Sequence, residues 1–216
     1  MSQQAFYFDG TRCTGCKTCQ MACKDYKNID LGISFRHVYE VTIGDTVKDA
    51  DGAFSTTCVS YPLSMSCNHC DSPVCFEKCP QSAIIKDADT GLMSIDEEKC
   101  IGCGTCAIVC PYNAPKVDEE KKKAVRCNGC AERVAAGEKP VCVEACPARA
   151  LDFGPVGEMK KRRRARGHRA VAPAEATVPN LFVKPSADRP SCGIEDGVVA
   201  NLLEVGFRAT DKEIMV

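Results

Sequence analysis

Hydrophobic and polar residues alternate along two parts of the chain, and both patterns predict antiparallel strand pairs. In AIIKDADTGLMSID, residues 83–96, two short apolar segments flank an Asp-Thr-Gly turn. A longer pair is predicted for SFRHVYEVTI, residues 34–43, and GAFSTTCVSY, residues 52–61, which are joined by a polar loop. We interpret the longer hairpin as an insertion into the surrounding fold.

Helical patterns are short. The apolar run at 107–109 lies between two cysteines and predicts one helical turn that a proline ends. A helix-like segment starts at Val156 and continues into the basic run KKRRRARGHR, residues 160–169, after which we expect an extended tail. The longest mostly apolar stretches, such as 197–207, fall short of the roughly 20 residues that a membrane-spanning helix needs.

Composition indicates a thin core. The chain has 216 residues with 18 cysteines, no tryptophan and only 6% aromatic residues, so something other than apolar packing must staple the fold. The N-terminal MSQQAFYFDG has no basic or apolar signal region, so we expect free thiols rather than disulfides. A net charge of -1 argues against a general nucleic-acid surface.

Sixteen of the 18 cysteines form four groups of four, and each group ends in C-x3-C. The first and third groups have the spacing C-x2-C-x2-C-x3-C of bacterial ferredoxins, whereas the second and fourth have longer middle spacers. In sequence order the groups are Cys13, Cys16, Cys19 and Cys23; Cys67, Cys70, Cys75 and Cys79; Cys100, Cys103, Cys106 and Cys110; and Cys127, Cys130, Cys142 and Cys146.

The sequence around the groups repeats as well. FDGTRCTGC leads into the first group and IDEEKCIGC into the third, while the second, third and fourth groups end in C-P-x-x-A. Four soft thiolates bind one iron-sulfur cubane, and the fourth cysteine of a ferredoxin run ligates the neighbouring cluster. Two alternatives remain open: zinc, for which the fourth group alone has acceptable spacing, and disulfides.

Several other residues have two interpretations. Arg12, Lys99 and Arg126 each precede the first cysteine of a group, where positive charge would favour the reduced cluster or simply face solvent. We interpret His69, within CNHC, as a loop histidine rather than a ligand, and Cys58 as a small buried strand residue.

Cys192 is interpreted as an incidental tail residue. The basic run at 160–169 fits a solvated helix face, anionic lipid or an acidic partner. It has no interleaved aromatic residues, so nucleic acid is disfavoured as a partner.

The chain resembles the iron-sulfur, electron-transfer subunit of the dimethyl sulfoxide reductase family of molybdenum oxidoreductases. The resemblance spans about residues 5–157, and a weaker similarity extends to the later segment VPNLFVKPSADRP. The basic run is longer than the family pattern, and residues after Pro190 match nothing in it. The matching segments are FDGTRCTGCKTCQMACKDYK, SFRHVYE, SCNHCDSPVCFEKCP, CIGCGTCAIVCPYNAP and CNGCAERVAAGEKPVCVEACPARALDFGP.

This resemblance implies an α+β fold of two interleaved bacterial-ferredoxin-like lobes, each with two [4Fe-4S] clusters, a β-hairpin insertion and an extended C-terminal tail. The implied divisions are an outer lobe at 1–33 and 120–157 with groups one and four, the hairpin insertion at 34–63, an inserted lobe at 64–119 with groups two and three, and a basic, extended tail at 158–216.

It also implies which cysteines share a cluster. Related nitrate reductase subunits replace a cysteine of the third group by tryptophan and hold a three-iron cluster, but Cys103 keeps that ligand here, so we expect four [4Fe-4S] clusters. The implied ligand sets are Cys13, Cys16, Cys19 with Cys146; Cys127, Cys130, Cys142 with Cys23; Cys67, Cys70, Cys75 with Cys110; and Cys100, Cys103, Cys106 with Cys79.

The implied function is electron transfer without catalysis by this chain alone. The implied partners are a catalytic subunit with molybdenum bound by two pterin dinucleotides and an integral-membrane anchor that oxidises quinol. We expect that this chain has no membrane-spanning segment. We expect it to lie in the cytoplasm, or to be exported with a signal-bearing partner and held at the membrane surface. A free-standing soluble polyferredoxin and a zinc-stapled interaction module are the alternative functions.

Overall fold

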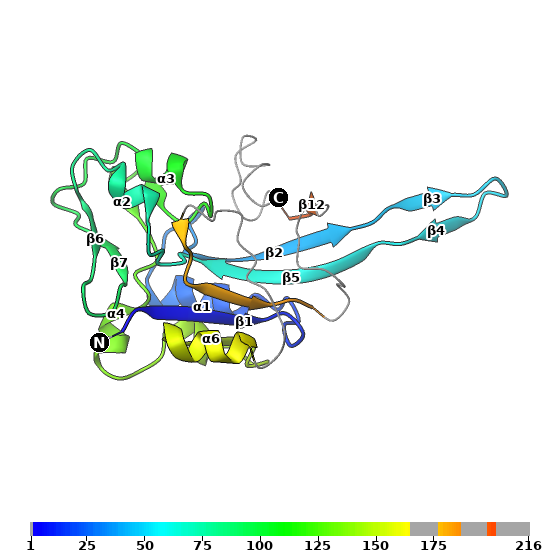
Figure 1. The fold of residues 1–216 in the computed structure, drawn as a ribbon. Helices are drawn as coiled ribbons and strands as arrows, with labels where there is room; N and C mark the ends of the chain where they lie inside the picture. Colours follow the sequence, from blue (N-terminus) through cyan, green and yellow to red (C-terminus); the bar gives the residue numbers. More distant parts are fainter. Residues whose placement is uncertain (1, 165–176, 187–197, 202–216) are drawn as a thin grey trace.

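The computed structural model describes residues 2–164, 177–186 and 198–201. It contains short helices and mostly paired strands, and within these ranges the longest helices have 9 residues. In sequence order (Figure 1) the elements are β1 (Gln4–Asp9), α1 (Thr18–Tyr26), β2 (Arg36–Ile43), β3 (Thr46–Lys48), β4 (Phe54–Thr56), β5 (Val59–Ser66), α2 (Val74–Glu77), β6 (Ile84–Lys86), β7 (Met93–Ile95), α3 (Thr105–Val109), β8 (Lys116–Asp118), β9 (Lys123–Val125), α4 (Ala131–Ala135), α5 (Val141–Glu144), β10 (Leu151–Pro155), α6 (Val156–Arg164), β11 (Leu181–Lys184) and β12 (Val198–Val199).

Strand β1 is the centre of a three-stranded sheet with the order β10-β1-β11. It pairs antiparallel with β10 and parallel with β11. Alternate residues point to opposite faces, so Phe6 and Phe8 pack into the cysteine-rich core while Ala5 and Tyr7 pack with Met159 of α6. Figure 1 shows α6 running along β1. Both faces of β1 are therefore covered, which explains why nearly all of its residues are buried.

Part of the segment after residue 158 lies within the described residues. Helix α6 starts at Val156, as predicted, and the later strand β11 joins the sheet beside β1. The predicted basic run at 160–169 lies within the described residues only as far as Arg164, and most of the tail beyond residue 186 lies outside them.

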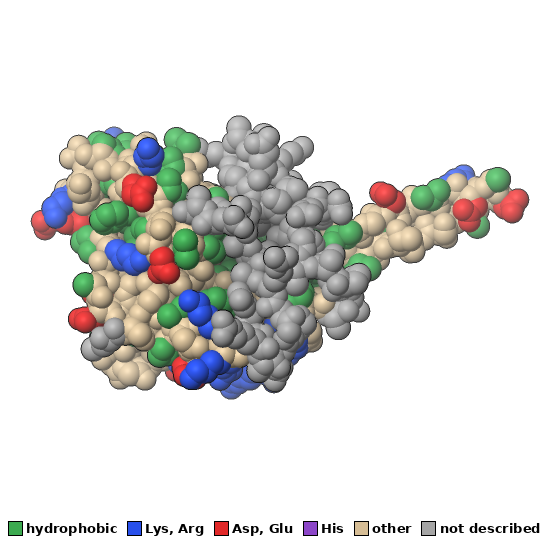
Figure 2. All heavy atoms as spheres, viewed as in Figure 1, with side chains coloured by type: hydrophobic (Ala, Val, Ile, Leu, Met, Phe, Trp, Pro, Cys, Tyr) green, Lys and Arg blue, Asp and Glu red, His purple; other side chains and the backbone are tan. Residues whose placement is uncertain are grey.

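A long two-stranded ribbon projects from the body (Figure 1). Strand β2 pairs with β5 from Arg36↔Ser66 to Ile43↔Val59, and β3 with β4 continues the ribbon outward. The second predicted strand, residues 52–61, is therefore displaced, because β5 continues through Pro62 to residue 66. Proline is tolerated there since β5 lies at the edge of the sheet with order β12-β2-β5. Figure 2 shows hydrophobic and charged side chains along the outer ribbon, which is exposed.

Two short hairpins, β6–β7 and β8–β9, complete the sheets. The first confirms the hairpin predicted within residues 83–96, and the Asp87 carboxylate fixes its turn by accepting hydrogen bonds from the backbone N–H and hydroxyl of Thr90. A small apolar cluster lies beneath these hairpins and joins Ile84 and Met93 to three cysteines. Cysteine side chains thus occupy core positions that apolar side chains usually occupy.

As to membrane insertion, the described residues contain no helix with the length and apolar character needed to cross a bilayer.

Candidate metal centres

Each cysteine group begins with a loop whose backbone turns through left-handed residues and then enters a short helix. In the first group Gly15 has φ 72° and Lys17 has φ 59° before α1, and in the third group Gly102 and Gly104 have φ 69° and 74° before α3. Glycine tolerates this conformation without the Cβ clash that other residues meet. The loops therefore curl and leave amide groups facing the sulfur atoms.

The repeated C-P-x-x-A sequence has a defined local structure. The residue before the alanine is left-handed in all three copies, Ser82, Asn113 and Arg149, with φ 47°, 50° and 51°. Its N–H donates to the carbonyl of the cysteine at 3.2 Å each time. The alanine N–H then turns toward the cysteine sulfur, at 3.3 Å from Ala83 to the Cys79 sulfur and from Ala150 to that of Cys146.

These turns explain the residue types in the motif. Proline suits the second position of the turn, and a small buried alanine lets the backbone approach the sulfur closely. Ala83 and Ala150 are only 2% and 1% exposed. The first group lacks the motif, and there α1 continues past Cys23 to Tyr26 instead. The C-P-x-x-A sequence thus places one amide dipole on each of these last cysteines.

Two cavities in the structure are lined by four cysteines each, together with apolar residues. Each cavity takes three cysteines from one group and the last cysteine of another. The two sets are Cys13, Cys16, Cys19 with Cys146, and Cys100, Cys103, Cys106 with Cys79.

The remaining cysteines also gather across groups. Burial raises the pKa of the Cys23 thiol, and the nearby sulfurs of Cys127, Cys142 and Cys130 raise it further. Burial likewise raises the pKa of Cys70 to about 12, with contributions from Cys67, Cys110 and Cys75. The fold thus gathers two further sets, which are Cys127, Cys130, Cys142 with Cys23, and Cys67, Cys70, Cys75 with Cys110.

The four sets lie in a row. Cys75 is near enough to Cys106 to raise its thiol pKa, although burial is the larger cause. Cys67 acts in the same way on Cys127, whose pKa burial raises to about 12. A third link joins Cys142 to Cys19, where burial again contributes most.

Burial distinguishes the ends of this row from its middle. Cys16 and Cys103 are exposed, and each sulfur forms a hydrogen bond with the threonine hydroxyl two residues later, at 3.3 and 3.4 Å. These hydrogen bonds lower the pKa of both thiols. Cys13 and Cys79 are partly buried, and the other twelve are buried. Metal binding to the buried thiols must therefore release protons.

His69 lies between two of the sets. It is 1% exposed, and its Nδ1 accepts a hydrogen bond of 2.9 Å from the backbone N–H of Met93. Burial lowers its pKa to about 3, helped by Arg126 and Arg36, so the ring is neutral and carries its proton on Nε2. That Nε2 lies 4.0 Å from the Cys127 sulfur. His69 is thus in a loop, as predicted, but deeply buried.

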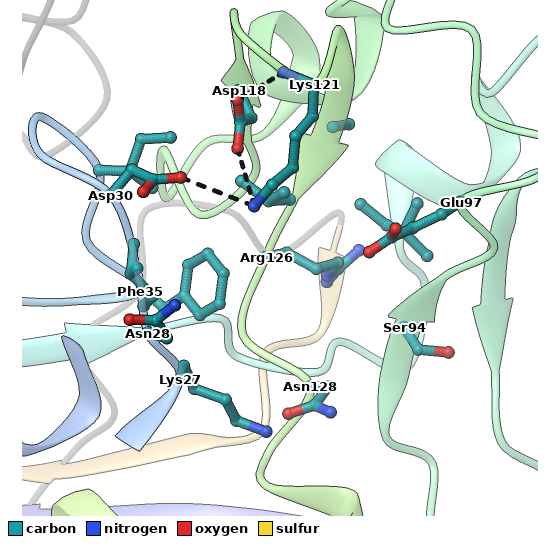
Figure 3. A pocket seen from close by; sticks show the side chains of 15 residues that line it. Lys27, Asn28, Asp30, Phe35, Ser94, Glu97, Asp118, Lys121, Arg126 and Asn128 are labelled. Atoms are coloured by element: carbon teal, nitrogen blue, oxygen red, sulfur yellow. Dashed lines mark hydrogen bonds and ion pairs between the residues drawn. The ribbon is translucent and has the colours of Figure 1, made fainter. Parts of the chain in front are cut away.

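Two buried arginines lie among the cysteines. Arg126 donates to the sulfurs of Cys67 at 2.6 Å and Cys75 at 3.5 Å. Arg36 donates to the hydroxyls of Ser64 at 3.1 Å and Ser66 at 2.9 Å. Arg126 also lines a polar pocket beside the end of α1, across which Lys121 pairs with Asp30 and Asp118 (Figure 3).

The sequence pointed to Arg126 but missed Arg36. The other two residues that precede a group differ from Arg126: Arg12 is exposed and donates to the Arg149 carbonyl, while Lys99 is exposed and pairs with Asp96. The one available signal for Arg36 is that it occupies a strand position on the same face as the buried Val38.

The donor geometry fits iron-sulfur cubanes better than single zinc ions. Among the described residues, no three His, Cys, Asp or Glu side chains converge closely enough to hold one metal ion. Zinc would need its sulfurs about 2.3 Å from a common centre, whereas a cubane keeps its four thiolates further apart. In addition, the Nε atoms of Arg36 and Arg126 are buried without a hydrogen-bond partner in the structure. Inorganic sulfide is an acceptor that would satisfy such donors.

The prediction for Cys58 is wrong. This cysteine is exposed, in the turn between β4 and β5, because the ribbon extends beyond the body and no part of the described chain buries it there. Its sulfur forms a hydrogen bond of 3.7 Å with the Thr46 hydroxyl. Cys192 lies outside the described residues.

Comparison with known proteins gives two family matches, the larger of which includes strand β5 of the ribbon. Residues 58–156 match a family described as a 4Fe-4S dicluster domain, and residues 11–26 match a 4Fe-4S binding domain.

Three relatives each match more than two thirds of this chain. The chain is 45% identical to the B subunit of anaerobic dimethyl sulfoxide reductase of Haemophilus influenzae over 206 residues, which is 95% of this chain and 100% of the relative. It is 46% identical to the Escherichia coli protein of that name over 207 residues, covering 94% and 99% of the two proteins. The iron-sulfur subunit of the nitrate-inducible formate dehydrogenase of Escherichia coli is 32% identical over 73% of this chain and 56% of its own length.

Proposed function

Because the protein belongs to the family of anaerobic dimethyl sulfoxide reductase B subunits, we propose that it is an electron-transfer subunit that carries four [4Fe-4S] clusters and performs no catalysis alone. The observation that carries this proposal is the gathering of the sixteen cysteines into four sets, each with three members of one group and the last of another. This is the exchange of fourth ligands that ferredoxins with two clusters use.

We assign one cluster to each set. The cavities support two assignments, and the mutual effects on thiol pKa support the other two. The clusters are held by Cys13, Cys16, Cys19 and Cys146; by Cys127, Cys130, Cys142 and Cys23; by Cys67, Cys70, Cys75 and Cys110; and by Cys100, Cys103, Cys106 and Cys79.

The four sets suggest two interleaved ferredoxin-like lobes. The outer lobe comprises 1–33 and the part of the chain up to residue 157 that follows the inserted lobe, and the ribbon begins at residue 34. The inserted lobe starts at residue 64, and we place its end after Val125 rather than after residue 119. The reason is that β8 and β9 form one hairpin, and Ala124 of β9 packs with the apolar cluster of the inserted lobe.

The row of sets indicates how electrons travel. Single electrons would pass along the four clusters between an end near Cys103 and an end near Cys16, because these are the exposed ligands. The middle step crosses between the lobes from Cys67 to Cys127, where His69 lies between them. Each step moves one electron and needs no acid, base or nucleophile from this chain. When bound, the clusters supply the redox chemistry, while the protein holds them in order and keeps water from the middle pair.

The partners we propose are a catalytic subunit holding molybdenum bound by two pterin dinucleotides and an integral-membrane anchor that oxidises quinol. One partner would contact each exposed end of the row. These partners would hold the protein at a membrane surface, either in the cytoplasm or after export with a signal-bearing partner.

Anaerobic isolation of the native protein tests the proposal. We expect it to co-elute with a molybdenum-containing polypeptide and to carry iron and acid-labile sulfide in equal amounts. A lone monomer with full electron-carrier activity and no molybdenum would instead indicate a soluble polyferredoxin. Stoichiometric zinc without acid-labile sulfide would indicate a zinc-stapled interaction module.

A further inference from the structure

Two guanidinium groups are buried in the middle of the row of cysteine sets, one on each side of the step between the lobes. Arg126 is 7% exposed and Arg36 is 1% exposed. Arginine remains protonated under all ordinary conditions, so both side chains bring a full positive charge into the interior. Removing such a charge from water is costly unless negative partners surround it.

The partners of Arg126 are sulfur atoms. Its two terminal nitrogens donate to the sulfurs of Cys67 and Cys75, which belong to one ligand set. Its backbone, however, directly precedes Cys127, a ligand of the set in the other lobe. Arg126 therefore connects one lobe, through its backbone, to the cluster of the other lobe, through its charge.

Arg36 has the corresponding place in the other set. Its guanidinium donates to two serine hydroxyls and lies near the Cys142 sulfur, whose charge acts on it more strongly than that of Cys19. The Arg36 Cζ atom also lies 4.8 Å from the centre of the Phe6 ring, so the face of the guanidinium packs against this aromatic side chain. Among the described residues, the charges that act on the two guanidinium groups are those of cysteine sulfurs and not of carboxylates, so sulfur is the anionic component available to both.

This placement has an electrostatic consequence. A cluster that accepts an electron gains one negative charge, and a buried site with low dielectric disfavours that gain more than an exposed site does. The two middle sets are buried, whereas each end set has an exposed ligand. Burial alone would therefore make the two middle clusters harder to reduce than the end clusters, and electrons would face a barrier at the step between the lobes. A fixed cation against the ligand sulfurs acts in the opposite direction.

We propose that Arg126 and Arg36 raise the reduction potentials of the two middle clusters, Arg126 for the set with Cys67 and Arg36 for the set with Cys142. The proposal rests on the proposed function, since it requires clusters in these sets. The unpartnered Nε atoms of both arginines support it, because each is a further donor available to cluster sulfide. Each arginine thereby offsets the effect of burial on its own cluster, which keeps the four potentials close enough for rapid transfer in either direction.

An EPR-monitored redox titration of the anaerobically isolated protein, with any partner it retains, tests the proposal. The variants are Arg126→Met, Arg126→Lys, Arg36→Met and Arg36→Lys. At fixed ambient potential, Arg126→Met is expected to lower the ratio of reduced to oxidised cluster at least tenfold for one cluster only, which is about 59 mV for a one-electron couple. Arg36→Met is expected to do the same for a different cluster, and each lysine variant should shift its cluster less because it keeps the charge.

Lys99→Met is the matched control. It stands at the same place in its repeat as Arg126, directly before the first cysteine of a group, but its side chain is exposed and pairs with Asp96. Removing this charge should leave all four potentials close to those of the unchanged protein, since solvent screens an exposed charge.

The iron content of each variant distinguishes a requirement for the positive charge of the arginine from a requirement for its packing. If a methionine variant loses a cluster that its lysine variant retains, positive charge is what the site requires, and the proposal stands. If both variants lose the cluster alike, the arginine is a packing element and the proposal fails. It fails equally if every variant keeps four clusters with unchanged potentials, or if Lys99→Met shifts a potential as far as Arg126→Met. Absence of clusters from the unchanged protein would refute the proposed function itself, which is a different outcome.

Discussion

Gly15 and Gly102 occupy the same position in two copies of the C-x-G-C loop, yet substitution by alanine should harm them unequally. Both have left-handed backbones, with φ 72° and 69°. A Cβ on Gly102 would lie 2.2 Å from the carbonyl oxygen of Lys122, whereas on Gly15 its nearest neighbour would be the Pro62 Cβ at 3.5 Å. The first distance is far inside van der Waals contact, and the second is an ordinary contact.

The expected magnitudes follow from these two geometries. Either alanine costs about 1–2 kcal/mol for holding a Cβ in the left-handed region. Gly102→Ala must also displace backbone of the β8–β9 turn, which adds about 1–3 kcal/mol, as overpacking does. For a protein of this size that added cost corresponds to a thermal midpoint lower by roughly 2–12 °C.

The assay compares Gly15→Ala and Gly102→Ala side by side after anaerobic preparation. The thermal midpoint is followed by circular dichroism at one scan rate, and iron is measured in the folded fraction. We expect Gly102→Ala to have the lower midpoint and to lose iron from one cluster, while Gly15→Ala retains its iron. Equal midpoints and equal iron contents would refute the reasoning, because the two variants differ only in what the added methyl group meets.

Three further predictions concern single residues. Cys103→Ser should convert or remove one cluster and leave the EPR signals of the others; simultaneous loss of all four would contradict separable lobes. Cys58→Ser should leave iron content unchanged and the midpoint nearly so, since this cysteine is exposed on the ribbon; loss of iron would make it a ligand. Burial raises the pKa of Asp152, but hydrogen bonding and charge from Lys139 and the charge of Arg162 lower it more, so the net pKa is low. A depressed carboxyl pKa stabilises the fold at all pH values above the ordinary value of about 3.9, and this stability is lost only as pH falls through the folded pKa. The midpoint penalty of Asp152→Asn should therefore be constant from about pH 8 to pH 5.5, and a penalty that disappears within this window would contradict the assignment.

Local sequence was sufficient for features that depend on a few neighbouring residues. The cysteine spacing, the turn of the β6–β7 hairpin and the start of α6 at Val156 are set by backbone preferences within one or two turns. The C-P-x-x-A repeat was visible as a pattern, and the structure adds its physical reason, a left-handed residue that directs an amide toward sulfur.

Features that depend on distant segments were not available from local pattern. Strand β11 pairs in parallel with β1, although most of the chain separates the two strands. No periodic pattern in the sequence encodes such a pairing. From the sequence alone, Arg36 would be expected to be a polar, exposed residue of a strand. Its burial becomes apparent only in the fold, where Phe6 and the cysteines surround it. Cys58 was predicted to be buried because strand residues of its size usually are, whereas its strand pair leaves the body.

The central claim is that sixteen cysteines hold four cubanes and that these cubanes staple a polypeptide with little apolar filling. Mössbauer spectroscopy of iron-57-labelled protein, prepared without oxygen, tests it most directly. The account predicts about sixteen iron atoms per molecule, four for each cluster, all with the spectrum of [4Fe-4S] centres. Protein that remains fully folded with far less iron than this would contradict it.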